Sequence, residues 1–131
     1  ETYETFVAGR LGLAAAAEYA VEVGQSWAWE RIQALADRAR QGLRDIAGIQ
    51  VHDQGQVQGG IVTFTLQGKD AEEIRQSLHS QGINVWTSSV FSARLDMEAR
   101  DLTRVVRVSP HYYNTEDEID RFLESLKRSR G

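Results

Sequence analysis

Cysteine is absent from this 131-residue chain, and histidine is scarce. Without a thiol the chain has no disulfide, no thiolate metal ligand and no cysteine nucleophile. The three histidines, His52, His79 and His111, lie far apart in the sequence and show none of the spacings that bind zinc. The sequence therefore predicts no metal site.

An excess of basic charge and long hydrophobic runs are also missing. The formal net charge is −4, which disfavours nucleic-acid binding because the phosphate backbone attracts a basic surface. No apolar run approaches the roughly 20 residues of a membrane span. Residues 1–6 also lack the basic start of a signal peptide. We therefore expect a cytoplasmic protein with no nucleic-acid or membrane partner.

The composition that is present, 41% hydrophobic and 26% charged, is typical of a soluble globular domain. No repeat or low-complexity tract divides the chain, which predicts a single domain over residues 1–131. The chain begins at Glu1, in a pattern that leads directly into a helix. We favour a segment of a longer protein over a processed N-terminus or a removed tag.

Apolar residues recur at spacings of three and four along four segments and alternate along four others, which predicts four helices and four strands. Ser26 is expected to cap the second helix. Asp70 with Glu73, and Thr115 with Glu118, have the spacing of capping boxes at the starts of the third and fourth helices. The order α-α-β-β-α-β-β-α predicts an α+β fold, a small and mostly antiparallel sheet with helices packed on one face. The predicted helices cover residues 7–23, 26–46, 70–78 and 115–126, and the predicted strands cover residues 49–51, 61–66, 83–86 and 105–108.

Two further expectations concern the second predicted helix and the long segment 87–103. Trp29 falls in the apolar stripe of that helix and is expected in the core. The charged positions of the helix are expected to face solvent rather than to bind a ligand. Residues 87–103 have no clean period, and a loop of that length is usually functional or mobile. The charged positions are Arg31, Asp37, Arg38, Arg40 and Arg44.

Arg107 is the strongest candidate for a functional residue. Alternation along the last strand puts Val106 and Val108 on one face and Arg107 on the other. A turn at residues 109–114 follows and leads to a helix N-terminus, whose amides attract anions. A guanidinium fork binds a carboxylate through two hydrogen bonds. An arginine in a strand can also pair with a structural carboxylate, so the pattern alone leaves both roles open.

The segment Arg107-Val-Ser-Pro-His-Tyr-Tyr-Asn-Thr115 resembles the C-terminal signature of class V aminotransferases. This pyridoxal-phosphate family includes cysteine desulfurases and isopenicillin-N-epimerase-like enzymes. The resemblance implies that Arg107 binds the substrate's α-carboxylate and that Tyr113 and Asn114 support its strand. It extends over essentially the whole chain, which would be the small C-terminal domain of a fold-type-I enzyme.

Two further segments resemble the family while departing from its desulfurase branch. The stretch from Glu1 to Leu13 is similar to the segment that leaves the large domain, and in desulfurases a Gly-Thr-Pro-Asn version reaches the cofactor phosphate of the partner subunit. Here Thr5 is the candidate for that contact. In the loop 87–103, Phe91 falls near the position of the desulfurase nucleophilic cysteine, so this domain cannot carry a persulfide. Arg94 and Asp96 in the same loop are more consistent with surface ion pairing than with substrate binding.

The family's defining residue, a lysine that binds pyridoxal phosphate, has no counterpart here. Lys69 falls in a turn and Lys127 at a helix end, so the chain alone is expected to be non-catalytic and to hold no cofactor covalently. The resemblance implies a parent enzyme with an N-terminal pyridoxal-phosphate-binding large domain on the same polypeptide, a homodimer, and an amino-acid substrate. The reaction type stays open.

Two other functions remain as alternatives. The chain could be a free-standing α+β small-molecule-binding or regulatory module, with Arg107 as the ligand anchor and no catalysis. It could also be an interaction domain that uses Trp27, Trp29 and Trp86 as contact residues, which ranks last because Trp29 is expected in the core.

Overall fold

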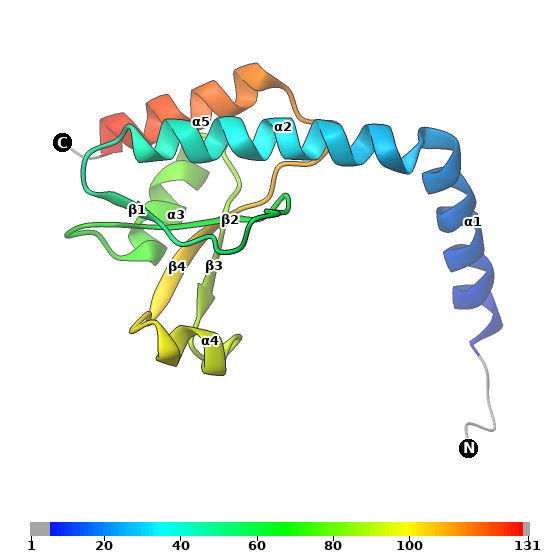
Figure 1. Cartoon of the computed structure of the whole chain (residues 1–131), viewed down its shortest axis with the longest axis horizontal. Helices are drawn as coiled ribbons and strands as arrows, with labels where there is room; N and C mark the ends of the chain where they lie inside the picture. Colours follow the sequence, from blue (N-terminus) through cyan, green and yellow to red (C-terminus); the bar gives the residue numbers. More distant parts are fainter. Residues whose placement is uncertain (1–5, 130–131) are drawn as a thin grey trace.

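A four-stranded antiparallel sheet with helices packed on one face forms the body of the protein (Figure 1). The structure, a computed structural model, describes residues 6–129. It confirms the predicted α+β class. The elements are α1 (Val7–Val23), α2 (Gln25–Arg44), β1 (Ile49–Val51), β2 (Val62–Leu66), α3 (Ala71–Ser80), β3 (Trp86–Ser89), α4 (Arg94–Ala99), β4 (Arg104–Val108) and α5 (Glu116–Ser129).

The sheet has the strand order β1-β2-β4-β3, so β4 is an inner strand and β3 lies at the edge. Every neighbouring pair is antiparallel. Alternation along β2 buries Val62, Phe64 and Leu66 under the helices, and Val106 and Val108 do the same in β4. The opposite face of the sheet, here called the outer face, therefore carries the residues in between, among them Thr63, Thr65, Val105 and Arg107.

The hydrophobic core lies between the sheet and helices α2, α3 and α5. The rings of Phe64 in β2 and Phe122 in α5 meet edge-on with centroids 6.2 Å apart. Truncating a buried phenylalanine such as Phe122 to alanine typically costs about 3–5 kcal/mol. The core therefore fixes α5, and with it the turn that precedes α5, against the sheet. The helical core residues are Leu35, Ala36, Ala39, Leu43, Ala71, Ile74, Leu78, Ile119, Phe122, Leu123 and Leu126.

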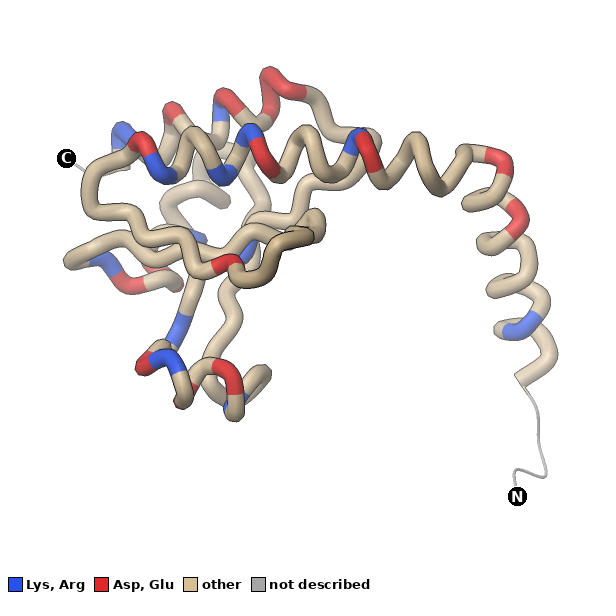
Figure 2. Tube along the Cα trace, viewed as in Figure 1, with Lys and Arg blue, Asp and Glu red and all other residues tan. Residues whose placement is uncertain are grey.

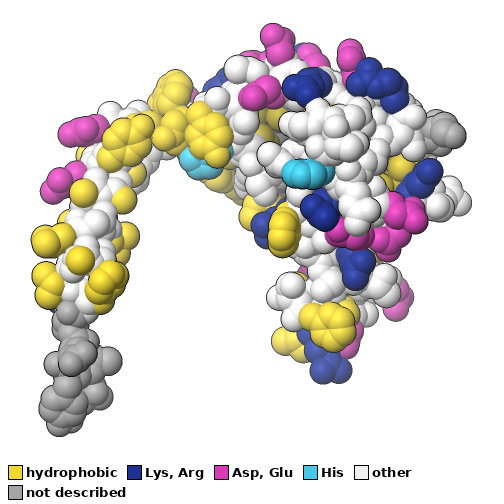
Figure 3. All heavy atoms as spheres, turned by 180° about the vertical axis from the view of Figure 1, so that it is seen from behind, with side chains coloured by type: hydrophobic (Ala, Val, Ile, Leu, Met, Phe, Trp, Pro, Cys, Tyr) yellow, Lys and Arg dark blue, Asp and Glu magenta, His cyan; other side chains and the backbone are white. Residues whose placement is uncertain are grey.

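Helix α1 projects away from the body as an arm (Figure 1). Gly24, at a φ of 90° that suits glycine, separates it from α2. No residue of α1 is buried, and it carries little charge (Figure 2). Apolar side chains cover it on the side seen in Figure 3, and no described helix is long and apolar enough to cross a membrane. The large apolar side chains exposed on or just before α1 are Phe6, Val7, Leu11, Leu13, Tyr19 and Val21.

Three predicted boundaries were wrong. The third strand is residues 86–89 rather than 83–86, because the β3–β4 register would put Ile83 opposite Pro110, which has no N–H to donate. The predicted loop 87–103 contains the end of β3 and the six-residue helix α4, anchored by the buried Met97. Helix α2 begins at Gln25 with Gly24 as its N-cap, so Ser26 is not the cap.

Two expectations for side chains of α2 were also wrong. Arg40 is 1% exposed rather than solvated, because Asp53 and the loop before β2 fold over it. Its guanidinium donates to Asp53 at 2.7 Å and to the carbonyl of Ile61 at 3.3 Å. Trp29 is 43% exposed rather than in the core, because the N-terminal half of α2 extends past the sheet (Figure 1).

Candidate functional site

Arg107 lies on the outer face, near the C-terminal end of the inner strand β4. Its Cα pairs with Thr63 of β2 on one side and with Trp86 of β3 on the other. Side chains of directly opposed residues in an antiparallel pair lie on the same face of the sheet. Thr63, Arg107 and Trp86 therefore form one row across three strands.

The guanidinium of Arg107 has no internal partner in the part of the chain that the structure describes. Its Nε is buried and makes no hydrogen bond, and Arg107 forms no ion pair with residues 6–129. A buried polar group without a partner costs about 1–3 kcal/mol, more when it is charged. A ligand that accepts hydrogen bonds would satisfy this group, which makes Arg107 the candidate binding residue.

Asn114 stabilises the turn that follows the arginine strand. The side-chain oxygen of Asn114 accepts a hydrogen bond from the backbone N–H of His111 at 2.8 Å. The backbone N–H of Asn114 in turn donates to the carbonyl of His111 at 2.9 Å. The side-chain amide also donates to Glu118 at 3.2 Å. These bonds close the turn on itself, as a supporting role for Asn114 requires; that role stays a prediction.

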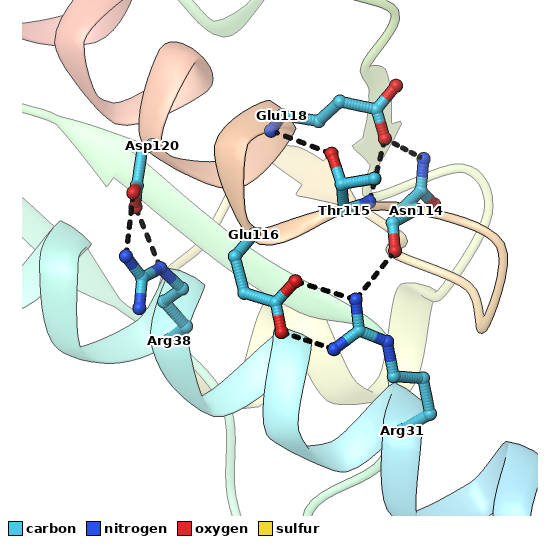
Figure 4. Close-up of polar contacts among 7 residues, drawn as sticks. All are labelled: Arg31, Arg38, Asn114, Thr115, Glu116, Glu118 and Asp120. Carbon is cyan, nitrogen blue, oxygen red and sulfur yellow. Dashed lines mark hydrogen bonds and ion pairs between the residues drawn. The ribbon is translucent and has the colours of Figure 1, made fainter.

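The predicted capping box at the start of α5 is present in full (Figure 4). The Thr115 hydroxyl accepts from the N–H of Glu118 at 3.2 Å, and the Glu118 carboxylate accepts from the N–H of Thr115 at 2.9 Å. The backbone bond to Thr115 is the main cause that lowers the pKa of Glu118 below its usual value. At α3 only half of the predicted capping box forms. The side chain of Asp70 accepts from the N–H of Glu72 at 2.8 Å, as an N-cap does, but the Glu73 side chain makes no hydrogen bond within residues 6–129.

Two arginines of α2 bind α5 and the turn that precedes it (Figure 4). Arg31 pairs with Glu116, with one contact at 2.7 Å, and donates to the backbone carbonyl of Asn114 at 3.0 Å. Arg38 binds both oxygens of Asp120 at 2.7 and 2.6 Å. The hydrogen bond from Arg31 lowers the pKa of Glu116 to about 2, and the bond from Arg38 lowers the pKa of Asp120. Figure 2 shows the opposite charges along these two helices.

Because the folded pKa of Glu116 lies below its ordinary value of 4.5, its ionised form stabilises the fold above pH 4.5. That stabilisation should be lost as the pH falls from about 4.5 towards 2. Glu116→Gln should therefore lower the thermal unfolding midpoint at pH 6 and have a much smaller effect at pH 2.5. The matched control is Glu124→Gln, at an exposed position of α5 that forms no ion pair with residues 6–129. An equal shift by Glu116→Gln at both pH values would contradict the linkage.

Aromatic side chains of the turn pack towards the junction of α1 and α2. The ring of Tyr112 lies 5.9 Å from that of Trp27 and 4.6 Å from that of His111, measured between centroids. A hydrogen bond with Tyr19 of α1 raises the pKa of Tyr112. Tyr113 is 73% exposed, and its ring centroid lies 5.0 Å from that of His111. Tyr113 thus belongs to the aromatic cluster of the turn and leaves much of its surface free.

A hollow of about 370 Å³ adjoins the same turn but does not contain Arg107. Polar and apolar side chains line it in similar measure, and its charged members, Glu118 and Arg121, already make hydrogen bonds inside the protein. The candidate site is therefore the outer face at Arg107 rather than this hollow. The lining residues are Gly82, Ile83, Asn84, Val85, Val108, Ser109, Pro110, Tyr113, Asn114, Glu118, Ile119, Arg121 and Phe122.

The segment after β3 places Phe91 at the surface, 95% exposed. The charged residues of α4 pair within the segment: Arg94 with Glu98 at 2.8 Å, and Arg100 with Asp96 at 3.0 Å. Arg94 and Asp96 are thus engaged in surface ion pairs, though not with one another. Such exposed pairs contribute little, typically about 0–1 kcal/mol.

The remaining candidates lie away from Arg107 or outside the described residues. Lys69 lies in the turn between β2 and α3, and Lys127 in the last turn of α5. Thr5 lies outside residues 6–129, so its proposed phosphate contact stays a prediction. Within residues 6–129, no group of three acidic or histidine side chains could hold a metal ion.

Sequence reasoning missed how Arg31 and Glu116 fix the turn. A signal was available, because Arg31 and Arg38 are two helical turns apart and Glu116 and Asp120 one turn apart. Two such rows on facing helices predict a pair of interhelical ion pairs. Trp86 was missed as a neighbour of Arg107, because the pairing of β3 with β4 depends on register and not on local pattern.

The aminotransferase class-V family model matches residues 3–122, nearly the whole chain and the full row around Arg107. The chain belongs to the aminotransferase class-V family. Its recognition as a relative of cysteine desulfurases is confirmed: it is 30% identical over 122 residues to a probable cysteine desulfurase of Mycobacterium leprae, a match that covers 93% of this chain and 20% of the relative. The family uses pyridoxal phosphate.

A second relative and a solved structure show the same similarity over nearly the whole chain. A probable hercynylcysteine sulfoxide lyase of Mycobacterium tuberculosis is 34% identical over 125 residues, covering 94% of this chain and 31% of the relative. The apo structure of a cysteine desulfurase from Thermococcus onnurineus superposes with a TM-score of 0.91 at 23% identity, covering 98% of this chain and 32% of that one. The fold is thus that of the C-terminal small domain of cysteine desulfurases. The chain spans only about a fifth to a third of the length of these class-V proteins.

Proposed function

We propose that residues 1–131 form the C-terminal small domain of a pyridoxal-phosphate enzyme acting on an amino acid, and that Arg107 binds the substrate's α-carboxylate. The observation that carries the proposal is the buried, unpartnered Nε of Arg107 on an otherwise paired inner strand. A carboxylate would complete that guanidinium through charge-assisted hydrogen bonds. The match to the family over residues 3–122 supports the same role.

Positioning is what this chain contributes to the reaction. Pyridoxal phosphate, when bound by the parent enzyme, supplies the electron sink for breaking a bond at the substrate's α-carbon. Arg107 holds one end of the substrate, and a fixed carboxylate restricts which α-bond faces the cofactor. Orientation of this kind supplies a large part of the rate in many enzymes. Asn114, Arg31 and the capping box keep the end of β4 in place through the turn.

The exposed apolar surface of α1 supports a large N-terminal domain as the partner of this chain. Its large apolar residues are exposed, with Leu11 at 67%, Leu13 at 71% and Val21 at 68%. Contiguous exposed apolar surface of this kind marks an interface. We assign it to the preceding part of the same polypeptide, because the matched relatives are three to five times longer. A homodimeric parent and a cytoplasmic location remain part of the proposal.

The cofactor should be held outside this chain. Lys69 follows the end of β2 and neighbours Asp70, and Lys127 complements the C-terminal dipole of α5, so neither lies near the outer face at Arg107. Borohydride reduction of the full-length protein loaded with pyridoxal phosphate, followed by peptide mapping, should place the label on a lysine that precedes residue 1. A label on Lys69 or Lys127 would overturn this assignment.

The absence of cysteine limits the sulfur chemistry that this domain supports. A desulfurase mechanism needs a thiolate that attacks the substrate sulfur. Phe91, exposed in the segment after β3, offers none. If the parent acts on a sulfur-containing amino acid, the sulfur must leave without a persulfide on residues 1–131. Transamination, epimerisation and C–S bond cleavage all remain compatible with Arg107 as the carboxylate anchor.

A free-standing ligand-binding module is the second candidate, because the same outer face could anchor a carboxylate without catalysis. The length of the natural polypeptide separates the two. A protein isolated from its source with an intact mass near that of a complete family member supports the enzyme. An intact mass equal to that of residues 1–131 alone would favour the module.

A further inference from the structure

We propose that Trp86 forms a wall of the substrate site beside Arg107 and selects amino acids with uncharged or cationic side chains over those with a second carboxylate. The inference rests on the proposed function, because it assumes that Arg107 binds the substrate. It adds what the proposed function leaves open, the class of side chain that the site accepts.

Strand register places Trp86 directly opposite Arg107, on the same face of the sheet. Trp86 is the first residue of β3, and its Cα pairs directly with that of Arg107. Opposed side chains in an antiparallel pair have Cβ atoms roughly 4.5–5.5 Å apart on one face. A substrate carboxylate held by Arg107 therefore brings the rest of the substrate within reach of the indole.

Nothing in the described part of the protein buries this tryptophan. Trp86 is 61% exposed on an edge strand, and its ring stacks on no other aromatic ring of residues 6–129. An exposed tryptophan at the edge of a sheet is not needed for the core, which the opposite face of the sheet provides. Trp86 lies opposite Arg107, whose Nε is the buried polar side-chain atom that lacks a hydrogen-bond partner among residues 6–129.

Within residues 6–129, the neighbours of Arg107 along its strand and across the sheet offer no second free cation to an anionic ligand. On its other side lies Thr63, whose hydroxyl already contacts Asp53 at 3.0 Å. Arg104, three residues before Arg107, points to the helix-covered side and lies 3.6 Å from Asp70. A second carboxylate on the substrate would thus find no free guanidinium here.

The indole itself adds the selectivity. The face of an indole ring carries partial negative charge, so it attracts cations and the edges of aromatic groups and repels carboxylates. An uncharged side chain gains apolar contact on it instead. The row Thr63, Arg107, Trp86 therefore combines a single carboxylate anchor with an apolar, electron-rich wall.

The test compares three amino acids as probes of the full-length enzyme. Dissociation constants for L-phenylalanine, L-alanine and L-aspartate are measured from the change in cofactor absorbance, for the wild type and for Trp86→Ala, Trp86→Phe and Trp86→Arg. Trp86→Ala should weaken L-phenylalanine about ten-fold and leave L-alanine, which is too short to cover the wall, nearly unchanged. Trp86→Phe should retain most of the preference. Trp86→Arg should tighten L-aspartate by about ten-fold, since it adds the missing second cation.

Controls separate this inference from the proposed function. Trp29→Ala removes another exposed tryptophan, on α2, and should change none of the three constants. Equal weakening of L-phenylalanine and L-alanine by Trp86→Ala, or no gain for L-aspartate in Trp86→Arg, overturns the role of Trp86 while Arg107 can still behave as proposed. If the wild type binds none of the three and Arg107 variants change nothing, both proposals fall.

Discussion

Replacing Arg107 with lysine in the full-length enzyme should lower kcat/KM for its amino-acid substrate by roughly thirty- to a thousand-fold, which corresponds to about 2–4 kcal/mol. The charge is retained, but lysine cannot offer the planar fork that holds two carboxylate oxygens at once. Arg107→Ala should be at least as damaging, because it removes the charge as well. Cofactor loading should stay intact in both variants, since the cofactor is expected on the preceding domain. Steady-state kinetics and the cofactor absorbance measure the two effects.

The carboxamide of the same substrate provides the control for this experiment. It lacks the negative charge, so the wild type should use it poorly, and the Arg107 variants should lose the preference for acid over amide. Arg44→Lys, at the exposed C-terminal end of α2, should leave kcat/KM unchanged. Near-normal kcat/KM in both Arg107 variants, or equal turnover of acid and amide by the wild type, would mean that Arg107 is structural.

Arg40→Met should destabilise the fold by about 3–5 kcal/mol, because it leaves a buried carboxylate without its partner. Asp53, whose side chain is 8% exposed, would lose its bond to Arg40, and the carbonyls of Gly59 and Ile61 would lose their donor. This guanidinium therefore links the start of the loop between β1 and β2, at Asp53, to its end, at Gly59 and Ile61. Thermal or urea unfolding, followed by a probe that reports on the small domain, measures the loss.

An exposed ion pair between α2 and α5 provides the comparison for this result. Arg38 and Asp120 are 47% and 43% exposed, so Arg38→Met should cost no more than about 1 kcal/mol. The double variant Arg40→Met with Asp53→Asn should recover part of the stability, because the asparagine removes the unpaired charge and can still accept from Thr63. Should Arg40→Met prove as mild as Arg38→Met, the buried pair would have no special role.

The sequence predicted those parts of the fold that depend on neighbouring residues. The capping box of Thr115 and Glu118 spans four positions, and the alternation that puts Arg107 opposite Val106 spans two, so both could be read locally. Helical spacing alone could not reveal that Arg40 is buried, because the residues that cover it come from a loop many positions away. The six residues of α4 are too few to show a helical period.

The candidate site, too, contains some residues that the sequence could predict and others that it could not. Arg107 and the turn closed by Asn114 could be predicted, because a resemblance of nine consecutive positions carries them. The row of Thr63, Arg107 and Trp86 could not, since it requires the registers of two strand pairs. A strand shifted by one residue would have placed Trp86 on the helix-covered face. Pairing between distant strands therefore decides which side chains share the candidate site, even where the proposed anchor can be found from the sequence.

The inner position of β4 has a consequence for how such a site can change over evolution. Arg107 cannot be displaced without unpairing β4 from strands on both sides, whereas β3 is held along one edge only. A mutation in β3 can therefore alter the shape of the site at a modest cost in stability and leave the anchor in register. With Arg107 as the proposed carboxylate anchor, proteins with this sheet could diverge in the molecules they accept while the arginine stays where it is.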